Sequence, residues 1–245
     1  MTEQEWWLVC SHPGLMLSRL PKKTSNRKLR LFACACCRGI WQLLTDERSR
    51  EAVEAAERFA DGLIRKKELK VALAAASRMP NGPMSEEETA AYAVARLAVP
   101  YAGGAAESVL EVVVHVGLTP KERQQSEKYR DLDLRYMEPE PARALYQAIW
   151  GRRCRECSDL LREVIGNPFR PLTLDPAWST PAVVQLARSL YEEQRFEDMP
   201  VLADALEEAG CQDAAVLGHC RGPGPHVRGC WVRFVGYQYH QFRWR

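Results

Sequence analysis

The sequence predicts an all-α protein, an irregular multi-helix bundle with a proline-rich loop. Three observations lead to this fold class. Apolar residues recur at three- and four-residue spacing along most of the chain, residues that favour helix N-termini precede these stretches, and proline or glycine follows them. The sequence shows no alternating strand pattern and no repeat of fixed period, so neither a sheet nor a solenoid is expected.

The first half of the chain is predicted as a series of helices separated by short breaks. Thr2 and Glu5 have the spacing of a capping box, and acidic residues follow the later starts, where the helix dipole favours them. The first predicted helix runs from Thr2 to the His-Pro-Gly turn at 12–14, and the second covers 27–44 after a cap at Ser25 or Asn26. The third runs from Thr45 to about Gly62, and the fourth continues to about Met79, where the break at 79–83 begins. The last two run from Ser85 to Pro100 and, after Gly103-Gly104, over 107–118.

The second half is predicted to contain one long helix, a loop and two shorter helices. The long helix covers Glu140 to Ile165, with Gly151 as an interruption. Four prolines make 167–181 (NPFRPLTLDPAWSTP) a loop, because proline lacks the backbone donor that helices and central strands need. The shorter helices extend from Thr180-Pro181 to Tyr191 and from Asp198 to Ala209.

These elements predict a single helical domain over residues 1–232 and a basic, aromatic C-terminal tail over 233–245. In the domain, the proline-rich loop and the Gly-Pro-Gly-Pro turn at 222–225 are expected at the same end of the bundle. The tail combines aromatic rings with arginines, a composition that can stack nucleic-acid bases and neutralise phosphates.

The bulk composition argues against several classes of protein. The chain has 245 residues, 46% of them hydrophobic, and its 34 basic and 32 acidic residues leave a formal charge of +2. That charge is too small to predict nucleic-acid or membrane binding by the whole chain. The N-terminus lacks the pattern of a secretory signal, and the odd count of nine cysteines fits reduced thiols in a cytoplasmic protein.

Four blocks of the sequence carry a resemblance. In chain order, these blocks are RKLRLFACACC, NPFRPLTLDPAW, LADALEEAGC and HCRGPGPHVRGCW. With them the chain resembles a family of uncharacterised helical proteins found as many paralogues in certain large bacterial genomes. The resemblance covers most of the chain and brings no activity with it. The stretch MPVLADALEEAGCQD is also similar to the repeat-companion domain, which implies a companion or interaction role.

Two cysteine motifs suggest metal or redox chemistry. Cys34, Cys36 and Cys37 lie on or near the apolar stripe of one helix, which favours simple packing. Cys154 and Cys157 form CREC, the spacing of half a zinc site or of a redox pair. A helix also brings residues at this spacing to one face without any ligand, so packing is the preferred interpretation here too.

The segment 219–231, HCRGPGPHVRGCW, is the strongest candidate site. His219, Cys220, His226 and Cys230 are all residue types that bind zinc, and Cys154 and Cys157 could complete such a set. The preferred interpretation is structural and metal-free, because the spacing matches no standard scaffold and nearby arginines oppose a cation. In this interpretation His226 and Arg228 hold the turn against the helix that contains Asp204, and Arg221 and Arg228 pair with acids such as Asp204 or Glu208.

No phosphate loop, nucleophile elbow or HExxH motif is present. We therefore expect a non-enzymatic protein-interaction or accessory module without a cofactor, whose partner is another protein. Trp6, Trp7 and Trp178 are candidate anchors for that partner, although each is a candidate for core packing as well. The alternatives are a zinc-binding structural or nucleic-acid-associated protein, and an enzyme that uses His226 with Asp175 and Arg228.

Overall fold

The computed structural model describes residues 1–76, 84–99, 101–116, 122, 140–170 and 175–232. Helices make up the regular structure of these residues, and no strand occurs among them. The predicted all-α class is therefore confirmed. Within the same ranges no helix combines the length and the apolar character that crossing a membrane requires. The predicted break at 79–83, Pro100 and the C-terminal tail lie outside the described residues.

The chain divides into two compact units, which are residues 1–158 and residues 159–245. The boundary falls inside one long helix, α8 (Glu140–Ile165). That helix has the bounds predicted from the sequence, and Gly151 continues it without interruption. A single domain over 1–232 stays a prediction, because a division into compact units does not decide whether they fold separately.

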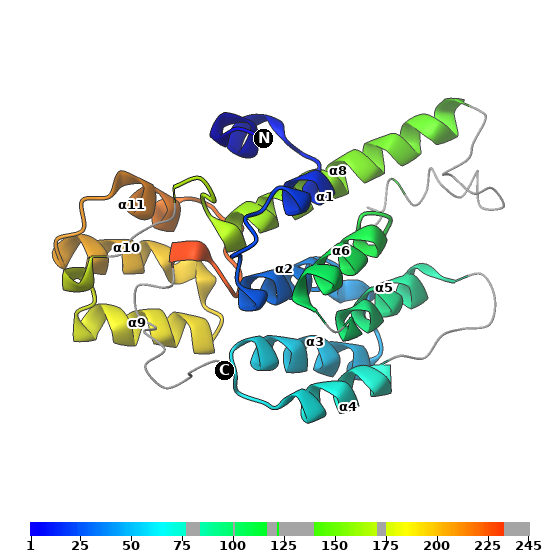
Figure 1. Cartoon of the computed structure of the whole chain (residues 1–245), viewed down its shortest axis with the longest axis horizontal. Coiled ribbons are helices and arrows are strands. Elements are labelled where there is room, and N and C mark those ends of the chain that lie inside the picture. The colour runs from blue at the N-terminus through cyan, green and yellow to red at the C-terminus, as the bar shows by residue number, and fades with distance from the viewer. Residues whose placement is uncertain (77–83, 100, 117–121, 123–139, 171–174, 233–245) are drawn as a thin grey trace. The chain divides into compact units, whose positions relative to one another are not determined.

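Unit 1 is built around α2 (Asn26–Arg38), which packs against α3 (Glu47–Ala60) and α6 (Ala102–Val113) (Figure 1). Every residue of α2 from Arg30 to Cys37 is buried, so this stretch of the helix is covered on all sides. Ser25 caps it, accepting a hydrogen bond from the Lys28 amide at 3.2 Å. The other described elements of unit 1 are η1 (Glu5–Val9), α1 (Pro13–Ser18), η2 (Trp41–Leu43), α4 (Lys66–Ala76), α5 (Glu86–Ala95) and η3 (Arg96–Ala98).

Three predicted boundaries of unit 1 need correction, two of them before residue 45. The His-Pro-Gly turn at 12–14 begins α1, because the His12 ring accepts from the Leu15 amide and Pro13 needs no hydrogen-bond acceptor at the first position of a helix. The helix predicted over 27–44 ends at Arg38. Gly39 follows, where a helix is costly to continue, and the Arg38 guanidinium stacks on Trp41 at 4.0 Å from the ring centre.

The third correction concerns Gly103-Gly104, which lie inside α6 and do not break it. The Tyr101 ring lies so close that a Cβ at Gly104 would come within 2.5 Å of it. Glycine therefore leaves room for the Tyr101 ring at this position and does not mark a turn.

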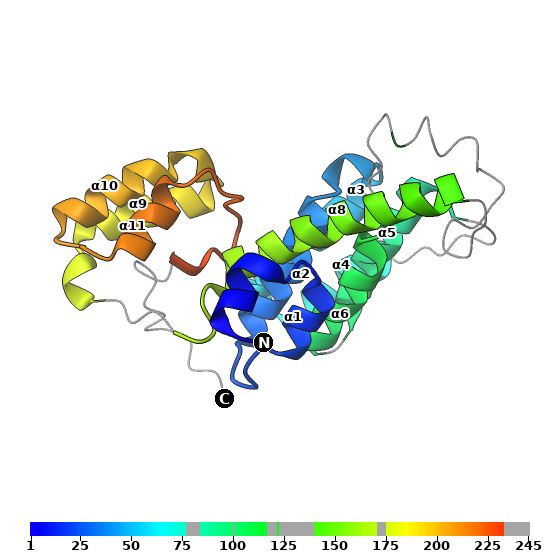
Figure 2. The ribbon, with the colours of Figure 1, turned by 90° about the horizontal axis from the view of Figure 1, so that it is seen from above.

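Unit 2 contains three helices that pack side by side, α9 (Pro181–Glu192), α10 (Met199–Glu208) and α11 (Ala214–Arg221) (Figures 1 and 2). Thr180 caps α9 and Asp213 caps α11, each accepting from amides of the first turn. The short helices η6 (Pro176–Trp178) and η7 (Phe196–Asp198) precede α9 and α10.

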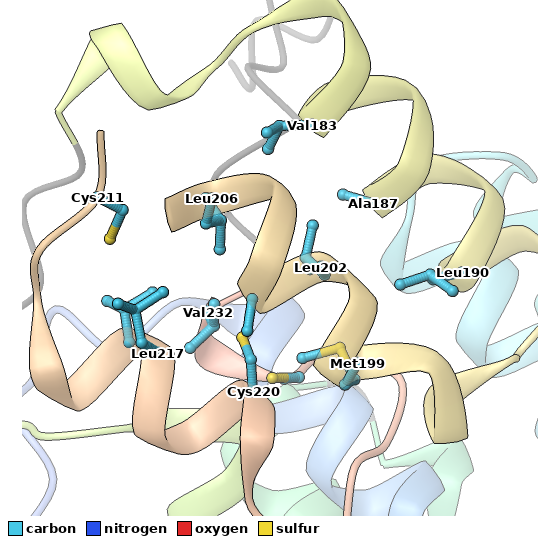
Figure 3. Close-up of a cluster of buried hydrophobic side chains, with 13 residues drawn as sticks. Val183, Ala187, Leu190, Met199, Leu202, Leu206, Cys211, Leu217, Cys220 and Val232 are labelled. Carbon is cyan, nitrogen blue, oxygen red and sulfur yellow. The ribbon is translucent and has the colours of Figure 1, made fainter. Parts of the chain in front are cut away.

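The core of unit 2 is formed by apolar side chains at three- and four-residue spacing on the three helices (Figure 3). Two residues beyond α11, Cys230 and Val232, complete this core, and both are at least 98% buried. Trp178 from the proline-rich loop and Trp231 pack against the same cluster. The segment after the Gly-Pro-Gly-Pro turn is therefore part of the core of unit 2.

Candidate functional site

The candidate segment 219–231 begins in the last turn of α11, where His219 lies. The chain then turns at Gly224, which has φ +86°. A Cβ at this position would lie 2.6 Å from the backbone nitrogen of His226, so a side chain is excluded both by conformation and by space. This turn returns His226 and Cys230 towards α11.

Four side chains of unit 2 converge on one point. They are Glu163 from α8, His219 from α11, and His226 and Cys230 from the segment after the turn. One potential ligand atom from each lies within 4.8 Å of all the others. We call this group the Glu163 cluster, and a group of this composition can hold a metal ion.

Glu163 occupies the centre of the cluster and is 4% exposed. Its Oε1 lies 3.3 Å from Nδ1 of His226, and its Oε2 lies 3.3 Å from Nε2 of His219. Burial alone raises the pKa of this carboxyl, but the hydrogen bonds from His219 and His226 outweigh burial and lower the pKa to about 2. Glu163 is therefore a carboxylate in the folded chain.

His226 is held from both ring nitrogens. Its Nδ1 faces Glu163, and its Nε2 lies 3.1 Å from the backbone oxygen of Gly222. A carbonyl oxygen only accepts, so Nε2 carries a proton and donates it. Burial lowers the pKa of His226, but the bond to Glu163 and its charge raise it by more, so the net shift is upward.

Cys230 supplies the sulfur of the cluster. Its Sγ lies 3.1 Å from Nε2 of His219, and the residue is 2% exposed. Burial first, and then the negative charge of Glu163, raise the pKa of the thiol well above its usual range. Without a cation nearby, Cys230 therefore stays protonated.

The structure brings together three of the six metal candidates predicted from the sequence. His219, His226 and Cys230 belong to the Glu163 cluster. Cys220 lies in the hydrophobic core of unit 2 instead (Figure 3). Cys154 and Cys157 belong to unit 1, while the Glu163 cluster is composed of residues of unit 2.

The three catalytic candidates make separate contacts. Asp175 caps η6, where its Oδ1 accepts from the Ala177 amide at 2.9 Å. The Arg228 guanidinium lies over the ring of Tyr191, 4.5 Å from its centre. The carboxylate beside His226 is Glu163, on a helix more than 50 residues earlier in the chain.

The contacts predicted for the arginines of the segment 219–231 are confirmed in part. Arg221 donates to Asp204 at 2.9 Å and to Glu207 at 2.5 Å, so the predicted pairing with Asp204 is confirmed. His226 contacts α8 through Glu163, whereas the sequence predicts that it holds the turn against the Asp204 helix. The observed partner differs because the turn points the His226 ring towards α8.

Sequence reasoning missed Glu163, although one signal for it exists. Glu163 lies in the last turn of α8, where the helix dipole disfavours a negative charge. Its neighbours Leu161 and Val164 are fully buried apolar residues of the same helix. An acid in such a position indicates a specific positive partner, but the sequence does not say which one.

A cleft of about 390 Å³ borders the cluster on one side. Its lining includes His226, the turn residues Gly222 and Pro223, and Arg221 at the end of α11. The remaining lining residues are Phe196, Glu197 and Pro200.

The three tryptophans considered as partner anchors differ in exposure. Trp6 is 1% exposed and belongs to the core, whereas Trp7 is 38% exposed. Trp178 is partly buried against the core of unit 2. Trp7 is therefore the anchor candidate that the structure leaves accessible.

The chain was compared with protein-family models, with curated proteins and with solved structures. None of these comparisons finds a match to this chain.

Proposed function

We propose that unit 2 binds one zinc ion through Glu163, His219, His226 and Cys230, and that this ion has a structural role. The observation that carries the proposal is the convergence of four potential ligand atoms within 4.8 Å. Thiolate, imidazole and carboxylate are the ligands that zinc takes in proteins, and four of them complete its tetrahedral shell.

The charges of the four groups support a divalent cation. The Cys230 thiolate and the Glu163 carboxylate together carry two negative charges, and both side chains are almost completely buried. A divalent ion between them makes the buried site neutral, which removes the cost of burying isolated charges. Binding also releases the proton of Cys230, because a metal ligand has to be deprotonated.

His226 has the arrangement typical of a metal-bound histidine. Such residues donate the ring N–H that faces away from the metal to a carboxylate or backbone carbonyl, which fixes the tautomer. In His226, Nε2 contacts the Gly222 carbonyl and Nδ1 faces the Glu163 cluster. The Gly222 carbonyl therefore supports Nδ1 as the ligand atom.

The positive charges of the arginines in this segment oppose a bound cation less than the sequence suggests. Arg221 is paired with Asp204 and Glu207 on the surface, where it is 43% exposed. Arg228 lies over the ring of Tyr191. Both charges have partners of their own, so the reason for preferring a metal-free segment is weaker once these contacts are known.

A shell of four protein ligands leaves no position for a substrate, which is the pattern of structural zinc sites. We therefore propose a non-enzymatic protein-interaction or accessory module. The proposed cytoplasmic location rests on the nine cysteines, none of which forms a disulfide, since a reducing compartment keeps cysteines in this state. The paralogue-family resemblance, the nucleic-acid role of the tail and the enzyme alternative stay predictions.

The proposed partner is another protein, which contacts the N-terminal region of unit 1. Trp7, Leu8 and Leu15 are exposed there, Leu8 by 78%. Exposed aromatic and aliphatic side chains are the usual anchors of a protein interface. Co-purification from the native host is the test: Trp7→Ser is expected to lose the partner and Leu63→Ser, an exposed apolar control, to keep it.

Elemental analysis of the full chain, purified without chelator, tests the zinc site. We expect about one zinc per chain, since four protein ligands hold a structural ion tightly. Cys230→Ser and Glu163→Gln should lose the ion. Cys220→Ser is the matched control, because this thiol neighbours His219 in sequence but lies in the core, and it should retain zinc.

Two results would overturn the zinc proposal. One is a wild-type chain that is free of zinc after purification and whose thermal unfolding does not change when zinc is added. The other is a Cys230→Ser chain that binds as much zinc as the wild type. Cobalt is a second probe, because a cobalt–thiolate bond has a charge-transfer absorption that should be present in Cys220→Ser and absent in Cys230→Ser.

A further inference from the structure

The cleft beside the Glu163 cluster takes its apolar lining from three segments of unit 2. Phe196 comes from η7, Pro200 from the first turn of α10, and Pro223 from the turn after α11. Phe196 is half-buried, while both prolines are exposed. The volume of about 390 Å³ lies at the small end of the range for ligand clefts, which is about 300 to 1,000 Å³. The cleft therefore suits one long side chain better than a large cofactor.

Carboxylates outnumber positive charges around this cleft. Arg221, the arginine of the lining, donates to both Asp204 and Glu207 through the same nitrogen, Nη2. Two carboxylates thus share one guanidinium. Glu197 adds another acid to the lining, and among the described residues nothing pairs with its exposed carboxylate. The surplus charge of the cleft is therefore negative.

Two further basic side chains adjoin the cleft, and each has a carboxylate of its own. Arg195, directly before η7, lies 3.0 Å from Glu193 and 2.9 Å from Asp198. His226 turns its Nδ1 towards the buried Glu163 carboxylate, at 3.3 Å. An anionic ligand would therefore meet an excess of carboxylates, whereas a cation would meet a carboxylate that has no partner among the described residues.

We propose that this cleft binds an arginine side chain of a partner protein. In the complex the guanidinium pairs with Glu197, and its flat face lies against the ring of Phe196. The aliphatic stem packs on Pro200 and Pro223, as long basic side chains do when they cover apolar surface. Aromatic rings pair more often with arginine than with lysine, which favours arginine as the occupant.

The inference goes beyond the proposed zinc site and does not depend on it. The charges that select the occupant are those of Glu197, Asp204 and Glu207, which are not members of the Glu163 cluster. A chain that binds no zinc would leave the cleft proposal standing, and a cleft that binds no arginine would leave the zinc proposal standing. The cleft also adds a second contact to the partner surface proposed on the N-terminal region of unit 1.

The probe is the blocked tripeptide acetyl-Gly-Arg-Gly-amide, titrated into the isotope-labelled full chain. Its binding is followed by the backbone amide signals in nuclear magnetic resonance spectra. We expect the signals of Glu197, Gly222 and His226 to move. The same peptide with citrulline, which has the shape of arginine without its charge, should leave them in place. Added salt should reduce the movement with the arginine peptide, since an exposed ion pair is screened.

A matched pair of variants tests the carboxylate. Glu197→Gln should weaken binding of the arginine peptide about fivefold, because it removes the acid of an exposed ion pair. The change keeps the size of an exposed side chain, so the fold should be preserved. Glu208→Gln is the control, because it removes an exposed carboxylate of α10 that lies outside the cleft lining, and it should bind the peptide as the wild type does.

Three results would overturn the proposal. The first is an arginine peptide that moves the cleft signals no more than the citrulline peptide does. The second is a Glu197→Gln chain that binds the arginine peptide as tightly as the wild type. The third is a peptide-free chain whose cleft signals change with its own concentration, or with Arg243→Gln or Arg245→Gln. The cleft would then belong to a second copy of the chain or to its own C-terminal tail.

Discussion

Both units bury cysteines, but the neighbours of those cysteines differ. In unit 1, Cys34, Cys36 and Cys37 lie in a run of buried residues of α2, and the Cys34 sulfur faces the Val53 carbonyl at 4.0 Å. In unit 2, Cys230 lies beside two imidazoles and a carboxylate. The first set of neighbours suits packing of reduced thiols in the core, and the second suits a metal ion. The residues brought beside a buried thiol therefore decide its chemistry, whereas a local cysteine motif does not.

The largest expected effect comes from removing zinc, and it should be confined to unit 2. A ligand that binds only the folded state, at a free concentration a thousand times its Kd, contributes about 4 kcal/mol of stability. A strong chelator should therefore speed amide hydrogen exchange in α9, α10 and α11 and leave α2 and α3 of unit 1 unchanged. Equal acceleration in both units would contradict a local zinc site.

The next effect tests the carboxylate of the Glu163 cluster in the absence of metal. With chelator present, Glu163→Gln should destabilise the chain by about 3 kcal/mol, because it removes the buried carboxylate whose oxygens lie 3.3 Å from the rings of His219 and His226. Urea unfolding measures this loss. Glu207→Gln is the matched control on a surface pair, where about 1 kcal/mol or less is expected. Similar losses in the two variants would show that the Glu163 carboxylate contributes no more to stability than a carboxylate in a surface ion pair.

The sequence predicts many local features of both units, although not the end of α2 or the helix α11, and it misses those that depend on distant residues. The caps at Ser25, Ser85 and Thr180 and the bounds of α8 follow from residues close together in the chain, and they agree with the structure. Glu163 lies 56 residues before His219, and no spacing rule joins them.

A smaller effect distinguishes a fully buried thiol of unit 1 from a half-buried one. Cys37→Ser should destabilise the chain by about 1 to 3 kcal/mol, because it places a hydroxyl at a site that is 0% exposed and that is packed for a thiol, not for a hydrogen bond. Cys10→Ser, at a half-buried position near the N-terminus, is the control and should change stability by about 0.5 kcal/mol or less. Urea unfolding under reducing conditions compares the two. A neutral Cys37→Ser would mean that this thiol does not act as a buried apolar group.

The smallest effect comes from removing a helix cap. Because caps act locally, the loss of stability should be equal in the two units. Ser85 in unit 1 accepts from the Glu88 amide at 3.1 Å, and Thr180 in unit 2 accepts from the Val183 amide at 3.3 Å. Ser85→Ala and Thr180→Ala should each lose about 1 kcal/mol in urea unfolding, while Ser85→Asp and Thr180→Asp should retain stability, since aspartate caps as well. The loss from Thr180→Ala should be the same with and without zinc. If it grew when zinc is removed, α9 would depend on the metal, and the effect of the Glu163 cluster would extend beyond the segments that it joins.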